Sequence, residues 1–147
     1  MQKISELGNS QGKKQMNDSF FIDTNILGYL ISSEEIEKHN IAKRIIKDKN
    51  CNISIQNLKE LSNILFKKTN LQPSEILEYI IKIGTFTTLL PELTTDITTA
   101  IKISKRKNFY DALLVATMRR NGLNTILTEN EKDFSDFKGI KVINPFK

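Results

Sequence analysis

The sequence predicts an α/β fold, a three-layer domain with a central, mainly parallel sheet flanked by helices. Short β-branched or aromatic segments alternate with longer segments of helical periodicity, the links are short, and no repeat or low-complexity tract interrupts them. Strands that alternate with helices in this way form parallel sheets covered on both faces. The 147 residues are expected to form one domain over residues 19–147, preceded by a flexible tail over residues 1–18, which has no sustained apolar period.

Two strands and three helices are predicted in the first half of the domain. Three large apolar residues in a row at 20–22 are typical of a strand buried on both faces, and this strand stops at Asp23. Ser33 is placed to cap the second helix, whose first turn is acidic and whose end is basic, as the helix dipole prefers. The predicted elements are a strand over 20–22, a helix over about 26–33, a helix over 34–49, a strand over 51–55 and a helix over 54–68, with Ile36, Ile41, Ile45, Ile46, Leu58, Leu61, Ile64 and Leu65 facing inward.

Three further helices and three further strands are predicted in the second half. Pro73 suits the first turn of a helix because its fixed φ is already helical. The segment 109–120 is apolar around most of its circumference, so this helix should be among the most buried, and Gly122 can take the left-handed conformation that ends it. The predicted elements are helices over 73–84, from 95 or 96 to about 103 and over 109–120, and strands over 85–90, 125–128 and 141–143, with a polar segment over 129–138.

The composition favours a cytoplasmic protein with an anionic partner. The single cysteine, Cys51, cannot form an internal disulfide, and the chain has neither a signal-peptide core nor the roughly 18 apolar residues that a membrane span needs. A reducing cytosol is therefore expected. The net charge of +5 favours RNA or DNA without identifying either, and the densest basic run is 105–107. Such a run is more often a solvated helix end than a nucleic-acid patch.

Acidic residues from distant parts of the chain are expected at one edge of the sheet. Asp23 ends the first strand, Glu60 lies in the helix after the second, Asp111 lies in the first turn of the buried helix, and Glu129 and Asn130 follow the fourth strand. Carboxyl ends of parallel strands converge on one crevice, where several carboxylates repel each other unless a cation neutralises them. A hard divalent ion such as Mg²⁺ or Mn²⁺ fits this oxygen-rich set and activates water for attack on a phosphodiester.

Each of these residues also has an ordinary structural explanation. Asp23 could be a helix N-cap, Asp111 a carboxylate stabilised by a helix dipole, and Glu60 a solvated residue on a helix surface. Acids in the loop after the fourth strand need no special explanation. Cys51 is expected to be a small buried hydrophobe and His39 an ordinary surface residue, which excludes zinc and Cys–His chemistry.

Taken together, the motifs resemble the PIN-domain family, especially its VapC-type ribonuclease toxins, over residues 19–146. The segments that carry the resemblance are Phe-Ile-Asp-Thr-Asn-Ile-Leu at 21–27, Leu-Lys-Glu-Leu at 58–61, Tyr-Asp-Ala-Leu-Leu-Val-Ala at 110–116, Ile-Leu-Thr-Glu-Asn at 126–130 and Lys-Asp-Phe at 132–134. The resemblance implies a parallel sheet flanked by helices, Mg²⁺- or Mn²⁺-dependent cleavage of RNA, inhibition by a cognate antitoxin, and a homodimer.

The resemblance also implies roles for individual residues. Asp23, Glu60 and Asp111 match the metal-binding acids of the family. Asn130 stands where many relatives have an aspartate, so that Glu129 before it and Asp133 after it are the other candidate metal ligands. The polar residues that match positions orienting water or substrate are Thr24, Asn25 and Thr128.

The sequence therefore predicts a metal-dependent endoribonuclease, the toxin of a type II toxin–antitoxin pair, in which the acids hold one or two ions. The residues expected to contact the RNA backbone are Lys105, Arg106, Lys107, Arg119 and Arg120. Because Asn130 departs from the family pattern, a PIN-fold module that binds RNA or protein without cutting is the alternative. A phosphoryl-transfer enzyme is less favoured, since no second aspartate follows two residues after Asp23.

Overall fold

The computed structural model describes residues 19–106 and 108–147, so the predicted tail at 1–18 and Lys107 lie outside the described residues. The described strands form one five-stranded parallel sheet in the order β3-β2-β1-β4-β5. This confirms the predicted fold class. The elements are β1 (Ser19–Ile22), α1 (Thr24–Ile31), α2 (Ile36–Asp48), β2 (Asn50–Ser54), α3 (Ile55–Lys68), α4 (Pro73–Phe86), β3 (Thr88–Leu90), α5 (Thr94–Ile103), α6 (Phe109–Arg120), β4 (Thr125–Leu127), α7 (Glu131–Phe134) and β5 (Lys141–Ile143).

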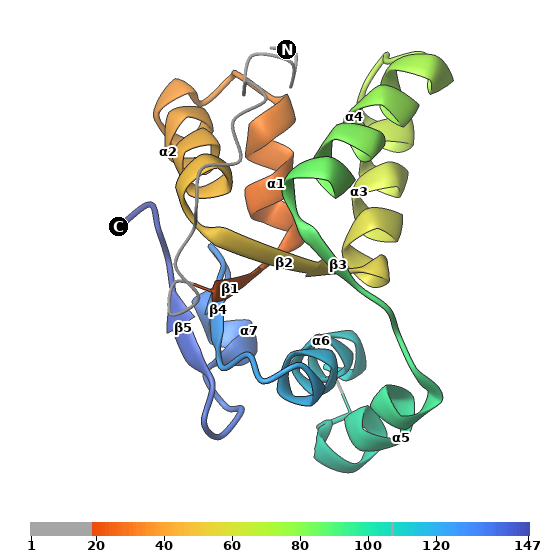
Figure 1. Ribbon diagram of the computed structural model, residues 1–147, viewed down its shortest axis with the longest axis vertical. Helices are drawn as coiled ribbons and strands as arrows, with labels where there is room; N and C mark the ends of the chain where they lie inside the picture. Colours follow the sequence, from red (N-terminus) through yellow and green to blue (C-terminus); the bar gives the residue numbers. More distant parts are fainter. Residues whose placement is uncertain (1–18, 107) are drawn as a thin grey trace.

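The sheet separates two hydrophobic cores, one on each face. Helices α1 to α4 lie on one face and α5 to α7 on the other (Figure 1). Side chains alternate along the two central strands: Phe21 and Ile126 are paired in register and belong to the core under α6, whereas Ile22 and Leu127 belong to the core under α1 and α2. This alternation is the period of two expected of a strand covered on both faces.

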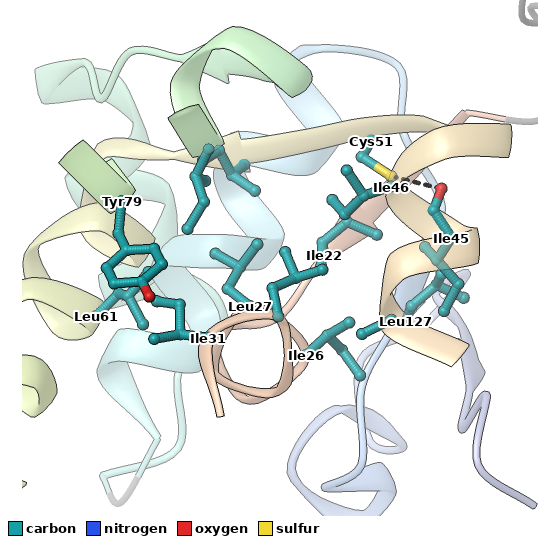
Figure 2. Packing of buried hydrophobic residues seen from close by; sticks show 14 of the residues in the cluster. Ile22, Ile26, Leu27, Ile31, Ile45, Ile46, Cys51, Leu61, Tyr79 and Leu127 are labelled. Carbon is teal, nitrogen blue, oxygen red and sulfur yellow. Dashed lines mark hydrogen bonds between the residues drawn. The ribbon is translucent and has the colours of Figure 1, made fainter. Parts of the chain in front are cut away.

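The larger core packs α1 to α4 onto the sheet (Figure 2). In it Ile26, Leu27 and Leu61 are fully buried. Cys51 is also buried, and its thiol donates a hydrogen bond to the Ile45 carbonyl at 3.5 Å, in agreement with the predicted role as a small buried residue. None of the helices in the described part of the chain is long and apolar enough to cross a membrane.

Several predicted boundaries and faces are wrong. Helix α2 begins at Ile36 with Glu35 as its N-cap, so Ser33 does not cap it. As the first residue of the helix, Ile36 stays 52% exposed. Ile64 is 39% exposed because the buried stripe of α3 runs through Leu61 and Leu65.

Two further differences concern element type. Helix α4 continues to Phe86, so β3 is restricted to Thr88–Leu90, and the polar segment after β4 contains the short helix α7. Phe134 anchors α7 in the second core.

His39 is buried, contrary to the prediction of a surface residue. It lies on the face of α2 that packs against α1, in line with Ala42 and Ile46, and its Nδ1 lies 2.7 Å from the Tyr29 carbonyl oxygen. Residues at a spacing of three and four share one face of a helix, which is why the core includes this polar ring.

Candidate active site

Asp23 lies at the carboxyl end of the central strand and is 8% exposed. It also caps α1, since its Oδ1 accepts a hydrogen bond of 2.8 Å from the Thr24 N–H, which is why the helix begins two residues earlier than predicted. Its Oδ2 accepts a hydrogen bond of 2.7 Å from the hydroxyl of Thr128, the residue after β4. Burial raises the pKa of Asp23, and the hydrogen bonds from Thr128 and Thr24 only partly oppose this effect. A helix cap and a carboxylate of the site are thus the same residue.

Glu60 is brought to Asp23 by hydrogen bonds from uncharged donors. It is half-buried in α3. The Thr24 hydroxyl donates to its Oε2 at 2.7 Å, and the Gln56 amide donates to its Oε1 at 2.7 Å. Because neither donor carries a charge, the negative charge of Glu60 is held in place without being neutralised.

Asp111, in the first turn of α6, shows that the acids share one electrostatic environment. Its pKa is raised from its ordinary value of 3.8 to about 6, by burial and then by the charges of Asp133, Asp23 and Glu60. Asp133, on α7, also raises the pKa of Asp23. The charges of four acids, one directly after β1 and the others within α3, α6 and α7, therefore affect one another.

The Glu129 carboxylate pairs with a cation, Lys38, instead of joining the other acids. Its carboxylate pairs with the Lys38 ammonium and accepts a hydrogen bond of 2.7 Å from the Tyr29 hydroxyl. Burial alone would raise the pKa of Glu129, but the hydrogen bonds from Lys38 and Tyr29 lower it below its ordinary value. Lys38 also lies over the rings of Tyr29 and Phe146, so this cluster ties the loop after β4 to α1, α2 and the C-terminal segment.

The remaining predicted polar residues contact the acids or the loop beside them. Asn25 donates from Nδ2 to Asp23 Oδ2 and to Thr128 Oγ1, both at 3.4 Å. Asn130 is exposed and precedes α7, and its backbone N–H donates to Thr128 Oγ1 at 3.0 Å. Thr128 therefore joins the first and fourth strands at the site.

The chemistry of this donor set fits a hard divalent cation. The four acids supply only oxygen ligands, and the pKa of Asp111 is raised first by burial and then by the negative charges of Asp133, Asp23 and Glu60. In the present side-chain arrangement of residues 19–106 and 108–147, no group of three or more His, Cys, Asp or Glu is placed to hold a metal ion. Glu60 and Asp23 each accept hydrogen bonds from donors within the protein.

The predicted RNA-contacting residues differ in their surroundings. The Arg120 guanidinium forms a two-point ion pair with Asp96, at 2.8 Å from Nε to Oδ1 and 3.0 Å from Nη2 to Oδ2, and Asp96 is 2% exposed. Arg119 donates to the Lys138 carbonyl. Lys105 makes an exposed ion pair of 3.3 Å with Asp136, and Arg106 is exposed. Lys107 is not among the described residues. The Arg120 guanidinium therefore joins α6 to α5 through its ion pair with Asp96.

Sequence reasoning did not find Gln56, Asn57 or Lys38. Gln56 precedes Glu60 by four residues, a helical spacing that places the two side chains together and could have indicated the contact. Asn57 contacts Thr24, and Lys38 contacts Glu129. Both contacts join residues that are distant in the sequence, and no local sequence pattern predicts them.

Comparison with known proteins agrees with this architecture. In a search of solved structures, the chain is similar to a toxin-antitoxin complex from Klebsiella pneumoniae (21% identity, 86% of this chain and 97% of that chain covered, TM-score 0.65). It is also similar to VapC20 of Mycobacterium tuberculosis (18% identity, 83% and 98% covered, TM-score 0.63) and to VapBC2 from Rickettsia felis (17% identity, 86% and 98% covered, TM-score 0.64). These likenesses concern the fold.

Comparison at the level of sequence identifies the family. None of the curated proteins matches the chain. The family model described as PIN domain matches residues 20–140, a span that begins in β1, ends just before β5 and includes Asp23, Glu60, Asp111 and Asp133. The chain therefore belongs to the PIN domain family.

Proposed function

We propose that this protein is a divalent-metal-dependent endoribonuclease and the toxin of a type II toxin–antitoxin pair, acting in the cytoplasm. The observation that carries the proposal is the hydrogen-bonded arrangement at the carboxyl edge of the sheet, where Thr128 donates to Asp23 and Thr24, the residue after Asp23, donates to Glu60. The raised pKa of Asp111, caused first by burial and then by the charges of Asp133, Asp23 and Glu60, supports it. Membership of the PIN domain family supports a nuclease. Among the similar structures, VapC20 is described as a Sarcin-Ricin loop cleaving toxin, which supports RNA as the substrate class.

In this proposal Asp23, Glu60, Asp111 and Asp133 hold one or two Mg²⁺ or Mn²⁺ ions. A bound ion of this kind lowers the pKa of a water molecule and stabilises the leaving oxygen of the phosphodiester. Asp133 supplies the fourth carboxylate, because Glu129 is paired with Lys38 and Asn130 has no charge. Thr128 holds the direction of the Asp23 carboxylate, and Asp111 would bind the ion in its ionised form.

The proposed partners are an RNA substrate, an antitoxin and a second copy of the chain. A toxin-antitoxin complex and a VapBC2 complex bound to promoter DNA are among the similar structures, which supports an antitoxin partner here. Lys105, Arg106, Lys107 and Arg119 are proposed to contact the RNA backbone. The homodimer remains an expectation from the family resemblance.

The alternative function is a module of the same fold that binds RNA or protein without cutting. It is favoured by the side-chain arrangement, in which no three acids of the described residues are placed to hold an ion. It is also favoured by Asn130, which departs from the aspartate that the family resemblance implies at this position.

Cleavage measured during a Mn²⁺ titration separates the two functions. Single-stranded and hairpin RNA oligonucleotides are incubated with wild type, Asp23→Asn and Asp136→Asn, the last replacing an exposed aspartate outside the acidic cluster. Asp23→Asn should lose at least about 100-fold in cleavage rate while keeping its circular dichroism spectrum, and Asp136→Asn should cleave as wild type does. Full activity of Asp23→Asn contradicts the proposed mechanism. Binding of RNA by wild type without cleavage at any Mn²⁺ concentration establishes the alternative.

A further inference from the structure

We propose that Gln56 and Asn57 are positioning residues that together hold both oxygens of the Glu60 carboxylate in the direction that a shared ion requires. The inference rests on the proposed nuclease site, because Glu60 matters to catalysis only if that site binds metal. The two residues form a clamp: Gln56 acts on Glu60 directly, and Asn57 acts through Thr24.

The orientation of the Asn57 amide is fixed by the backbone. Asn57 is fully buried in the first turn of α3, and its Oδ1 accepts hydrogen bonds from the Ser54 N–H at 2.7 Å and the Ser54 hydroxyl at 3.1 Å. A backbone N–H can only donate, so the oxygen of the amide must face Ser54. The NH₂ group therefore faces Thr24, and it donates to Thr24 Oγ1 at 3.1 Å.

This bond determines where the single hydrogen of the Thr24 hydroxyl points. Because Oγ1 already accepts from Asn57, its own O–H is directed at Glu60 Oε2, 2.7 Å away, and an ionised carboxylate can only accept. Thr24 is 5% exposed, so water has little access to compete for this hydrogen. The result is a one-way series of hydrogen bonds from Ser54 through Asn57 and Thr24 to Glu60.

Gln56 holds the second carboxylate oxygen of Glu60, and its own amide oxygen has no hydrogen-bond partner among the described residues. It is 6% exposed, and its Nε2 donates to Glu60 Oε1 at 2.7 Å and lies 3.5 Å from the Tyr110 carbonyl oxygen. Its Oε1 is buried and has no hydrogen-bond partner among the described residues. Rotating the amide would bring two acceptors together at Glu60, so the carboxylate dictates the orientation and leaves Oε1 unsatisfied. Such a cost is expected where a contact serves function more than stability.

The clamp also relates Glu60 to a second acid. Tyr110, whose carbonyl oxygen Gln56 approaches, directly precedes Asp111 in α6. Gln56, on the same helix as Glu60, therefore connects α3 to α6, the helix that carries Asp111. Each oxygen of Glu60 uses one lone pair on a neutral donor and keeps another for a cation, so the clamp sets direction and leaves the charge intact.

Mn²⁺ binding without RNA tests the clamp. Gln56→Met removes one donor, and Asn57→Asp keeps the oxygen that faces Ser54 while replacing the NH₂ group with an acceptor, so that the Thr24 hydroxyl turns away from Glu60. The matched control is Asn63→Met, which replaces an exposed amide on the same helix, α3, outside this network. The dissociation constant is measured by electron paramagnetic resonance of free Mn²⁺, and the thermal midpoint is measured without metal.

Both positioning variants should weaken Mn²⁺ binding about 10-fold, since groups that orient metal ligands typically contribute a factor of 10 to 100. Asn57→Asp is the stricter test, because its added negative charge would by itself strengthen binding. The control should bind as wild type does. Unchanged Mn²⁺ affinity in both variants, with the metal-free midpoint lowered, would show that Gln56 and Asn57 serve stability alone and would overturn the proposal.

A metal-free measurement separates failure of the clamp from failure of the proposed function. Hydrogen exchange of the Gln56 and Asn57 side-chain amides, followed by NMR, should be slow in wild type and at least about 10-fold faster for Gln56 in Glu60→Ala, which removes its acceptor. Exchange at Gln56 that is equally fast in both proteins overturns the clamp. Slow exchange in wild type with no Mn²⁺ binding supports the geometry of the clamp and contradicts the proposed metal site.

Discussion

The raised pKa of Asp111 shows how strongly its surroundings oppose its ionisation. Burial and then the charges of Asp133, Asp23 and Glu60 raise its pKa to about 6, whereas at Asp23 the hydrogen bond from Thr128 opposes the effect of burial. The folded protein therefore binds a proton at Asp111 more tightly than the unfolded chain, whose value is near 3.8. It follows that the stability contributed by this residue is fully present below about pH 3.8 and is lost as the pH rises through about 6.

Asp111→Asn should consequently stabilise the metal-free protein at pH 7. The gain is about 1 kcal/mol once the linkage energy is reduced for the solvent screening of a half-exposed group, and it should vanish near pH 3.5. Urea unfolding at both pH values measures it, with Asp136→Asn as the control for loss of a surface charge. A variant that is equally destabilised at both pH values would show that helix-dipole loss, and not carboxylate repulsion, governs this position.

At the level of single residues, the sequence offers candidate acids but not the side chains that contact them. Asp23 and Asp111 are candidates because each lies at a boundary between an apolar segment and a polar one. Glu129 and Asp133 could not be distinguished, since both lie in one polar segment. What separates them is Lys38, which reaches Glu129 from a helix 91 residues earlier in the chain.

Helices α5 and α6 are joined by an ion pair that accounts for a basic residue predicted to bind RNA. Asp96 is almost fully buried near the start of α5, where it also accepts a hydrogen bond of 2.9 Å from the Leu93 N–H. Burial opposes ionisation of Asp96, but the hydrogen bonds from Arg120 and Leu93 outweigh it and lower the pKa. Removing the guanidinium would leave this buried carboxylate without its cation, which is more harmful than losing an exposed pair.

Arg120→Met should therefore lower the thermal midpoint by several degrees, whereas Arg119→Met should change it by less than about 2 °C. Arg119 is the matched control because it is the preceding residue of α6, is exposed, and donates to a backbone carbonyl instead of a buried acid. Differential scanning calorimetry at neutral pH measures both midpoints. Equal shifts would mean that the Asp96 pair contributes no more than a surface contact.

At the level of elements, the bounds of a helix could be predicted where the sequence clearly marks the end of the helix. The bounds of α6 are confirmed because its apolar sequence is followed by Asn121 and Gly122, and Gly122 has a φ of 71°. Helix α2 is preceded by several polar residues that could each cap a helix, and Ser33 was the wrong choice. Helix α7 was missed because four residues are too few for a periodic pattern, and only the burial of Phe134 gives it a core face.

Across the whole molecule, alternation along the central strands explains why the polar residues gather at one edge. Phe21 and Ile22 bury their side chains on opposite faces, and Ile126 and Leu127 do the same in register, so the last two residues of each strand are buried and apolar. Asp23 and Thr128 are the first residues after these strands and hydrogen-bond to each other. The same parallel order brings the starts of α1, α3 and α6 to this edge, as Figure 1 shows for the sheet and its helices.

The distribution of charge over the molecule leads to a last prediction, on RNA binding. The acidic edge repels phosphate, so the net charge of +5 must act from the surface around it. Arg106 is exposed and lies just before α6, at the end of that helix that carries Asp111, whereas Arg44 is exposed on α2, across the sheet. Arg106 is therefore expected to contact RNA phosphate and Arg44 is not.

Binding of a fluorescent RNA oligonucleotide to Asp23→Asn protein, which should not cut it, is measured from low to high salt. Affinity should fall linearly on logarithmic axes, and Arg106→Ala should reduce the slope by about one. Arg44→Ala removes the same charge from the whole molecule, so a purely global effect would change both slopes equally and would refute a localised RNA surface. Arg119 lies about 12 Å along α6 from Asp111, and a reduced slope for Arg119→Ala would extend that surface along the helix.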